Sequence, residues 1–212
     1  MPRPSRWPEI LLAAGAEFRD HGYENATLEG IGARVGILKG SIYNYVGSKE
    51  ELLLAVVEQP ARALLAELAL LRADTSSTVA VRLRELIRMQ VRIFSEWYPA
   101  AFVYLRHLGH VVQSPKFAEF REMDGQYMAA VEGLLAEGAA TGEFSLPAEP
   151  RTVARAIVGM LDWMQHWFTP RGAAADRELA DELFALALGG LIAGGSMRAL
   201  ARSMPEGTSR TP

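Results

Sequence analysis

Apolar residues recur at helical spacing along almost the whole chain, and no convincing alternation of apolar and polar residues marks a strand. In the first helix, predicted over about 8–21, Ile10, Ala14 and Phe18 share one face and Gly22 suits the C-terminal end. The pattern predicts an all-α protein of about nine helices. The other eight are expected over about 27–35, 38–45, 48–72, 78–97, 100–110, 115–142, 150–168 and 176–195.

Local signals mark several of the helix ends. Thr27 can cap the second helix, and Gly36 breaks it. Ser48 and Glu51 form a capping box at the start of the long fourth helix. Because proline lacks an amide hydrogen, Pro60 is expected to kink this helix or to end it early.

Composition narrows the function. The 212 residues are 50% hydrophobic and 22% charged, so the chain can bury a substantial core. Because it has no cysteine, it can form neither a disulfide nor a thiolate metal site, and a cytoplasmic location is expected. There is no apolar run of about 18 residues that would predict a membrane span. The net charge of −3 does not by itself indicate nucleic-acid binding, so such affinity would depend on where the charges lie.

The stretch GILKGSIYNYVGSK, residues 36–49, is too polar for a buried helix and too regular for a loop. Two short helices joined through residues 35–37, with a third helix behind them, form a helix-turn-helix unit. A helix that enters the major groove of DNA must present a slim polar face. Here that face would consist of Lys39, Gly40, Ser41 and Asn44.

Two tyrosines and a lysine extend this surface. Tyr43 and Tyr45 offer hydroxyls to phosphates, and ring faces to thymine methyl groups or sugars. Lys49 lies in the first turn of the next helix, whose amides and partial positive charge also favour a phosphate. The alternative is that both tyrosines are surface aromatics of an ordinary three-helix packing unit.

The segment ILLAAGAEFRDHGYENATLEGIGARVGILKGSIYNYVGSKEELL resembles the N-terminal domain of TetR-family transcriptional regulators over about residues 9–57. The resemblance implies a homodimer whose two heads bind a palindromic DNA operator. It also implies a DNA-binding head over 1–50 and a helical effector-binding and dimerisation domain over 51–203, and the remaining tail over 204–212 is expected to be disordered. Carried over by position, the DNA contacts would be Thr27, Lys39, Gly40, Ser41, Tyr43, Asn44, Tyr45 and Lys49.

The head departs from the family pattern at three places. Leu38 stands where a Ser or Thr usually caps the recognition helix, and Val46 stands where an aromatic residue is usual. Gly30 and Gly32 are expected to loosen the second helix, each by up to about 1 kcal/mol relative to Ala. These departures predict a less stable head but remove no base-reading residue.

The C-terminal segments MLDWMQHWFTPRG and LFALALGGL resemble family members that sense acyl-CoA or steroid-derived CoA thioesters. Both predicted helices are apolar nearly all round, which is typical of buried helices. By resemblance they form a four-helix bundle with the same helices of a second copy. The dimer interface is predicted to contain Met160, Met164, Phe184, Leu188, Leu191 and Ile192.

Aromatic residues between positions 94 and 168 suggest an apolar pocket with a few polar guides, although many of them could be ordinary core. The predicted ligand-binding residues are Trp97, Phe102, Tyr104, Arg106, His107, Phe120, Met123, Tyr127, Trp163, His166 and Trp167. Arg82, Arg84, Arg88 and Arg92 are read as a solvated stripe, or else as a contact for a CoA phosphate.

The sequence therefore predicts a homodimeric repressor that a small hydrophobic effector releases from DNA, with no cofactor and no membrane partner. The competing hypothesis is a small-molecule-binding helical module whose DNA-binding head has weakened. An enzyme is not expected, because Ser41 and Ser48 have no acid or histidine placed as a partner. His107 and His110 are three residues apart, but no cysteine or nearby acidic residue completes a metal site.

Overall fold

The computed structural model describes residues 6–111 and 115–192. Within these ranges the chain is all α-helical, as the sequence predicts, with nine α-helices, two short 3-10 helices and no strand. No helix in the described ranges is long and apolar enough to cross a bilayer. The predicted tail 204–212 lies outside the described residues. The elements are α1 (Trp7–Asn25), α2 (Leu28–Val35), α3 (Lys39–Ile42), α4 (Lys49–Ala73), α5 (Val79–Glu96), α6 (Ala100–Val111), η1 (Pro115–Phe117), α7 (Ala118–Ala140), α8 (Pro150–Asp162), η2 (Trp163–His166) and α9 (Ala173–Ile192).

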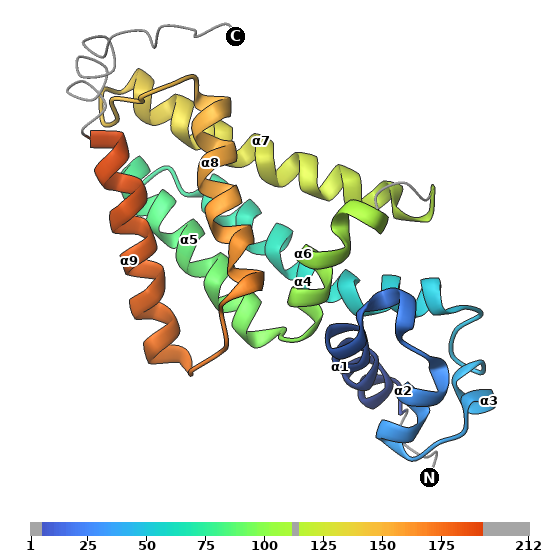
Figure 1. The fold of residues 1–212 in the computed structure, drawn as a ribbon. Helices are drawn as coiled ribbons and strands as arrows, with labels where there is room; N and C mark the ends of the chain where they lie inside the picture. Colours follow the sequence, from blue (N-terminus) through green and yellow to red (C-terminus); the bar gives the residue numbers. More distant parts are fainter. Residues whose placement is uncertain (1–5, 112–114, 193–212) are drawn as a thin grey trace, which may run out of the picture.

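A small head lies at one end of the molecule, and α4 runs from it into a larger helical domain (Figure 1). The head consists of α1, α2, α3 and the first half of α4, which pack around one apolar core. Gly22 has a positive φ of 74° and interrupts α1 where the first helix was predicted to end. The completely buried residues at the centre of this core include Ile10, Phe18, Ile31, Ile42 and Leu52.

Helix α5 lies inside the larger domain, where it packs against α4, α7 and α9 (Figure 1). Its buried face supplies the completely buried Leu83, Leu86 and Ile87. On another face, the Nε atoms of Arg84 and Arg88 donate to Asp181 of α9 over 3.0 and 2.7 Å. These guanidinium groups hold the pKa of the Asp181 carboxyl well below its usual range. The ion pairs therefore join α5 to α9 beside the apolar core.

Of the two outcomes predicted for Pro60, a kink or an early end of the fourth helix, the early end does not occur. Helix α4 continues from Lys49 to Ala73 with Pro60 buried inside it. A proline in a helix interior costs about 3 kcal/mol, because it removes one hydrogen bond and crowds the preceding turn. The buried neighbours Val57 and Ala61 continue the apolar face of α4 across this position. We infer that burial of this face against the rest of the protein offsets the local cost.

Three other helix ends differ from their predicted positions. The third helix, predicted over 38–45, is helical only over Lys39–Ile42 and then becomes a turn. The eighth, predicted over 150–168, ends at Asp162 and tightens into the 3-10 turn η2. The ninth begins at Ala173, a few residues earlier than predicted. Helical periodicity marked the right elements, but the local changes of helix type were not visible in it.

A pair of glycines on α7 tests the packing of the larger domain. A Cβ added at Gly138 would overlap the ring of Phe144, which is 5% exposed, whereas one added at Gly133 would meet no atom within 4 Å. We expect Gly138→Ala to lower the free energy of unfolding by about 1–3 kcal/mol, because the buried ring must move. Gly133→Ala should be neutral or stabilising by up to about 1 kcal/mol, because Ala favours the helix.

Urea denaturation of the two variants and the parent protein measures this difference. Equal stabilities for Gly138→Ala and Gly133→Ala would contradict the packing described here.

Candidate nucleic-acid interface and apolar pocket

Close packing in the predicted helix-turn-helix unit requires a glycine at position 32. A Cβ at Gly32 would lie 2.5 Å from the Ile37 carbonyl oxygen, and one at Gly30 would overlap the Glu17 carboxylate. The Ile37 amide donates to the Gly32 carbonyl over 2.9 Å, which closes the turn after α2. The sequence read both glycines as weak points. The structure corrects this for Gly32, because a side chain there would push α2 away from the turn that follows it, whereas at Gly30 only the end of the Glu17 side chain would have to move.

The helix caps were predicted correctly. The Thr27 side chain accepts a hydrogen bond from the Gly30 amide over 2.9 Å, and Gly36 ends α2 in the left-handed conformation with φ of 67°. The Ser48 hydroxyl accepts from the Glu51 amide over 3.1 Å, and the Glu51 carboxylate accepts from the Gly47 amide over 2.8 Å. These caps set the spacing between α2, α3 and α4.

Helix α3 and the turn after it form an outward-facing surface held by one buried residue. Ile42 is completely buried in the head core. Around it, Tyr43 and Tyr45 are 50% and 42% exposed, and Leu38, which provides no side-chain cap, is 82% exposed. Ser41 is half-buried at the edge of this surface. The other exposed residues of the surface are Lys39, Gly40 and Asn44.

Two residues of this surface have partners within the head. The Lys39 ammonium lies 2.8 Å from the Glu29 carboxylate of α2, and this contact raises the pKa of Lys39 and lowers that of Glu29. The Tyr45 ring stacks on Trp7 of α1, with ring centroids 5.7 Å apart and planes 7° apart. One face of the Tyr45 ring is therefore covered, while Tyr43 and Asn44 remain open to a partner.

Lys49 has a different role from the one predicted. Its ammonium donates to the carbonyl oxygens of Tyr23, Glu24 and Ala26 over 2.7, 3.0 and 3.1 Å, and it lies 4.6 Å from the centre of the Tyr23 ring. Since an ammonium has three N–H donors, all are used. Lys49 therefore fixes the corner between α1 and α2 instead of presenting a free charge to phosphate.

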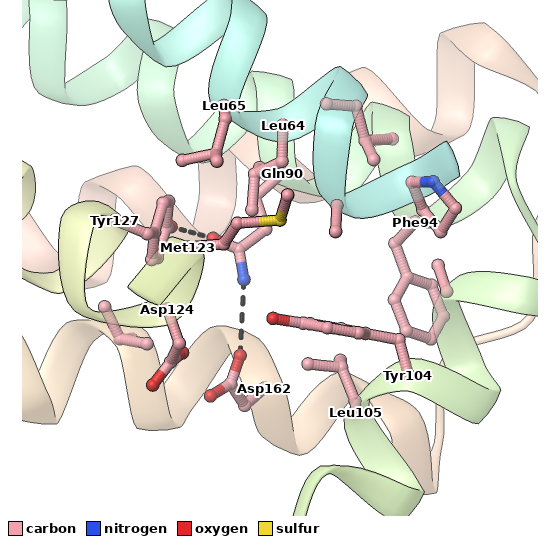
Figure 2. Close-up of a pocket in the computed structure, with 15 residues that line it drawn as sticks. Leu64, Leu65, Gln90, Phe94, Tyr104, Leu105, Met123, Asp124, Tyr127 and Asp162 are labelled. Atoms are coloured by element: carbon pink, nitrogen blue, oxygen red, sulfur yellow. Dashed lines mark hydrogen bonds between the residues drawn. The ribbon is translucent and has the colours of Figure 1, made fainter. Parts of the chain in front are cut away.

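A small apolar cavity lies in the larger domain, between α4, α5, α6, α7 and α8 (Figure 2). Its volume is about 60 Å³, which is room for a small group only. The lining residues are Pro60, Ala61, Leu64, Leu65, Gln90, Ile93, Phe94, Ala101, Tyr104, Leu105, Met123, Asp124, Tyr127, Val158 and Asp162.

Polar side chains meet on one side of this cavity (Figure 2). The Tyr127 hydroxyl donates to Gln90 Oε1, and Gln90 Nε2 donates to Asp162 Oδ1 over 3.4 Å. Burial, together with the nearby Asp124 carboxylate, raises the pKa of Asp162 to about 6, and the hydrogen bond from the Gln90 amide opposes this shift. Burial also raises the pKa values of Tyr104 and Tyr127, so both hydroxyls keep their protons.

Only part of the predicted ligand-binding set lines the cavity. Tyr104, Met123 and Tyr127 do so. Phe120 is buried in the core that continues into the head, while Trp97 and Phe102 are half-buried at the edges of the cores. Arg106 is exposed and lies over the Phe102 ring, 5.6 Å from its centre. The side chains of His107 and His110 lie outside the described residues.

The predicted contacts after α8 point away from the cavity. Trp163 and Trp167 are 61% and 50% exposed, and His166 is exposed beside Trp163. The change to 3-10 geometry at Trp163 ends the helical face on which the prediction placed them. Sequence reasoning missed Gln90, Asp124 and the α4 wall. It also missed Asp162, although an isolated acid within the apolar run MLDWM was a usable signal.

All four arginines of α5 have carboxylate partners, and the side chains of two of them, Arg84 and Arg92, are also partly exposed to solvent. Arg82 is buried and pairs with Glu137, and Arg92 pairs with Glu67 and with Glu96. Arg84 and Arg88 bind Asp181 as described above, and Arg88 also binds Glu85 over 2.9 Å. These pairs neutralise the positive charge along the helix.

An apolar groove of about 320 Å³ lies between α8 and α9. It is lined by residues such as Ile157, Met160 and Leu186, and Leu186 is 69% exposed. Of the predicted dimer residues, Met160, Phe184 and Leu188 are half-buried on these helices, and the side chains of Leu191 and Ile192 lie outside the described residues. Met164 is 1% exposed within the core of its own chain, so it is not an interface residue.

Lys49, which binds the α1–α2 corner, and Lys39, which lies on the outward-facing surface, make a matched test. We expect Lys49→Ala to lower the free energy of unfolding of the head by about 1–3 kcal/mol, because three carbonyl groups lose a charged donor. Lys39→Ala should have little effect, because its partner is a solvent-exposed carboxylate. Urea denaturation, followed by circular dichroism, compares the variants. Greater destabilisation by Lys39→Ala would overturn the assignment.

Comparison with known proteins identifies both parts of the chain. The family described as bacterial regulatory proteins, tetR family, matches residues 10–56, and a tetracyclin repressor-like C-terminal domain matches residues 76–191. The chain is 25% identical over 190 residues to the HTH-type transcriptional repressor KstR2 of Mycobacterium tuberculosis strain H37Rv, covering 88% of this chain and 93% of that protein.

Solved structures share the same fold. The ketosteroid transcriptional regulator KstR2 of Mycobacterium tuberculosis matches with a TM-score of 0.81 at 24% identity, over 90% of this chain and 96% of that one. AibR, in complex with isovaleryl coenzyme A and operator DNA, matches with a TM-score of 0.71 at 22% identity, over 86% and 97% of the two chains. The matched domains cover the head and the larger domain alike. The chain therefore belongs to the TetR family of bacterial regulatory proteins and is a ligand-responsive, DNA-binding transcriptional regulator.

Proposed function

We propose that this regulator is a cytoplasmic homodimer that represses transcription from a palindromic operator and leaves it when a small apolar effector fills the cavity. Each head places α3 in the major groove, with Tyr43 and Asn44 at the centre of the contact. The effector is an apolar compound, and a CoA thioester is the class that we favour. The AibR complex with isovaleryl coenzyme A supports this class, because that protein has the same fold.

The observation that carries the proposal is that α4 contributes both to the head core and to the cavity wall. Its first half supplies Leu52 and Leu53 to the head core, while Leu64 and Leu65 line the cavity. A cavity of about 60 Å³ cannot hold an acyl chain or a steroid without displacement of its walls. Because α4 is one continuous helix, displacement of its cavity wall reorients the head, and two reoriented heads no longer match the half-site spacing.

The competing hypothesis is that the protein is a small-molecule-binding module whose DNA-binding head has weakened. Neither hypothesis includes a catalysed reaction. One observation favours this competitor. In the described part of the head, residues 6–50, every Arg and Lys already has a partner, which leaves no uncommitted cation for phosphate. DNA binding must then come from exchangeable pairs, backbone amides and hydroxyls. Affinity for DNA is therefore the measurement that separates the two functions.

An anisotropy titration of labelled DNA from the promoter of its own gene tests operator binding. We expect Tyr43→Ala to weaken binding about tenfold or more, equivalent to about 1.4 kcal/mol. Leu12→Ala is the matched control, since Leu12 is also exposed on the head, at 66%, but lies on α1. Binding should fall steeply with salt. If Tyr43→Ala and Leu12→Ala bind as tightly as the parent protein, the repressor hypothesis is wrong and the binding module is supported.

The apolar groove between α8 and α9 gives a test of the dimer. We expect Leu186→Glu to produce monomers, because it places a charge in the apolar interface. Leu70→Glu is the control, since Leu70 is 73% exposed on α4 and does not line the groove. Sedimentation velocity of both variants at equal concentration measures the outcome. A dimer that survives Leu186→Glu would place the interface elsewhere.

A further inference from the structure

The described lining of the cavity has an acidic polar side and no basic group to balance it. Two carboxylates, Asp124 and Asp162, contribute to its lining, together with Gln90 and two tyrosines. Among the fifteen described residues that line it, none is Lys, Arg or His. Among the described lining residues, an anionic ligand would therefore meet two carboxylates and no compensating cation, which is an unfavourable arrangement in a partly buried site.

Asp162 lacks the partners that a carboxylate in this position needs. It is the last residue of α8, where the partial negative charge of the helix terminus adds to its own. Its one hydrogen bond within the described residues comes from Gln90 Nε2 and is long, at 3.4 Å. The Gln90 carbonyl already accepts from Tyr127, so the amide is held in this orientation. Asp162 therefore retains acceptor capacity directed at the cavity.

The Tyr104 hydroxyl completes the polar side. Figure 2 shows it directed toward the gap between Gln90 and Asp162. No side chain or backbone group in the described part of the chain forms a hydrogen bond with it. A ligand group placed in this gap could donate to the Asp162 carboxylate and accept from the Tyr104 hydroxyl. A hydroxyl can do both, and a protonated amine can make the first contact with a charge of the right sign.

We propose that the effector carries a hydrogen-bond donor and no negative charge at its buried end, with Asp162 as the acceptor and Tyr104 as the second contact. This proposal rests on the proposed function, since it describes the ligand of the same cavity. It excludes free carboxylic acids as effectors. It is compatible with a CoA thioester on one condition. The end of the acyl group that enters the cavity must be neutral and carry a hydrogen-bond donor, and the phosphates must stay outside the cavity.

Three probes with one skeleton test the charge preference. They are cyclohexylmethylamine, cyclohexylmethanol and cyclohexanecarboxylate, each titrated into the full-length dimer by calorimetry near neutral pH. The amine, the alcohol or both should bind at least tenfold more tightly than the carboxylate. Tighter binding of the amine than of the alcohol identifies a cation as the preferred group, and the reverse identifies a neutral hydroxyl. Equal or tighter binding of the carboxylate, or no binding of any probe, overturns the proposal.

Two variants connect that preference to the named residues. Asp162→Asn should reduce the affinity for the amine about tenfold or more, because it removes the charge and keeps the shape of the side chain. The difference in affinity between the amine probe and the carboxylate probe should therefore become smaller. Tyr104→Phe should weaken binding of the alcohol probe, and the amine should still bind more tightly than the carboxylate. Glu122→Gln is the matched control, since Glu122 is an exposed acid of α7 outside the cavity lining. An unchanged ranking in Asp162→Asn overturns the assignment.

Operator binding of the same preparations separates this test from the proposed function. Glu122 lies outside the cavity lining, so Glu122→Gln without ligand should bind operator DNA as the parent does. If the parent fails to bind DNA, the repressor hypothesis fails whatever the probe ranking. If DNA binding holds and the ranking is reversed, the ligand assignment alone is wrong.

Discussion

The structure depends on one helix that belongs to two hydrophobic cores. Helix α4 is 25 residues long, or roughly 37 Å at the usual helical rise. Its first half fills the head core through Leu52 and Leu53, and Leu68 is buried in the core of the larger domain. Pro60 lies between these regions and forms part of the cavity wall. In the mechanism that we propose, movement of the cavity wall reorients the head through this helix, because close-packed cores do not deform gradually.

A second contact connects the head to the same cavity. Gly15 of α1 allows a close approach, since a Cβ there would lie 3.2 Å from Pro99 Cγ. Arg19 lies over the Tyr98 ring, 5.3 Å from its centre, and Tyr98 in turn lies 6.2 Å from the ring of Phe94 in the cavity wall. The head is thus attached through α1 as well as α4. Two attachments make it respond as a rigid body, which suits a change in half-site spacing.

The features that were predicted from sequence are those set by residues close together in the chain. The Thr27 and Ser48 caps and the Gly36 turn all depend on neighbours within four residues. Lys49 was misread because its carbonyl partners come more than 20 residues earlier, so only the folded corner brings them together. Gly32 was misread for the opposite reason, since helix propensity penalises glycine without regard to a carbonyl oxygen that packs against it.

The cavity was only partly predictable, because aromatic content does not distinguish a wall from a core or a surface. Tyr104 and Tyr127 line it, yet Trp163 and Trp167 of the same aromatic pattern lie on the surface after the change of helix type. Polarity is more informative than aromaticity here. A carboxylate within an apolar helix must be solvated, paired or reserved for a ligand, since burial without a partner is costly. Asp162 meets that condition next to Gln90, and this makes it the residue through which the fold could distinguish one effector from another.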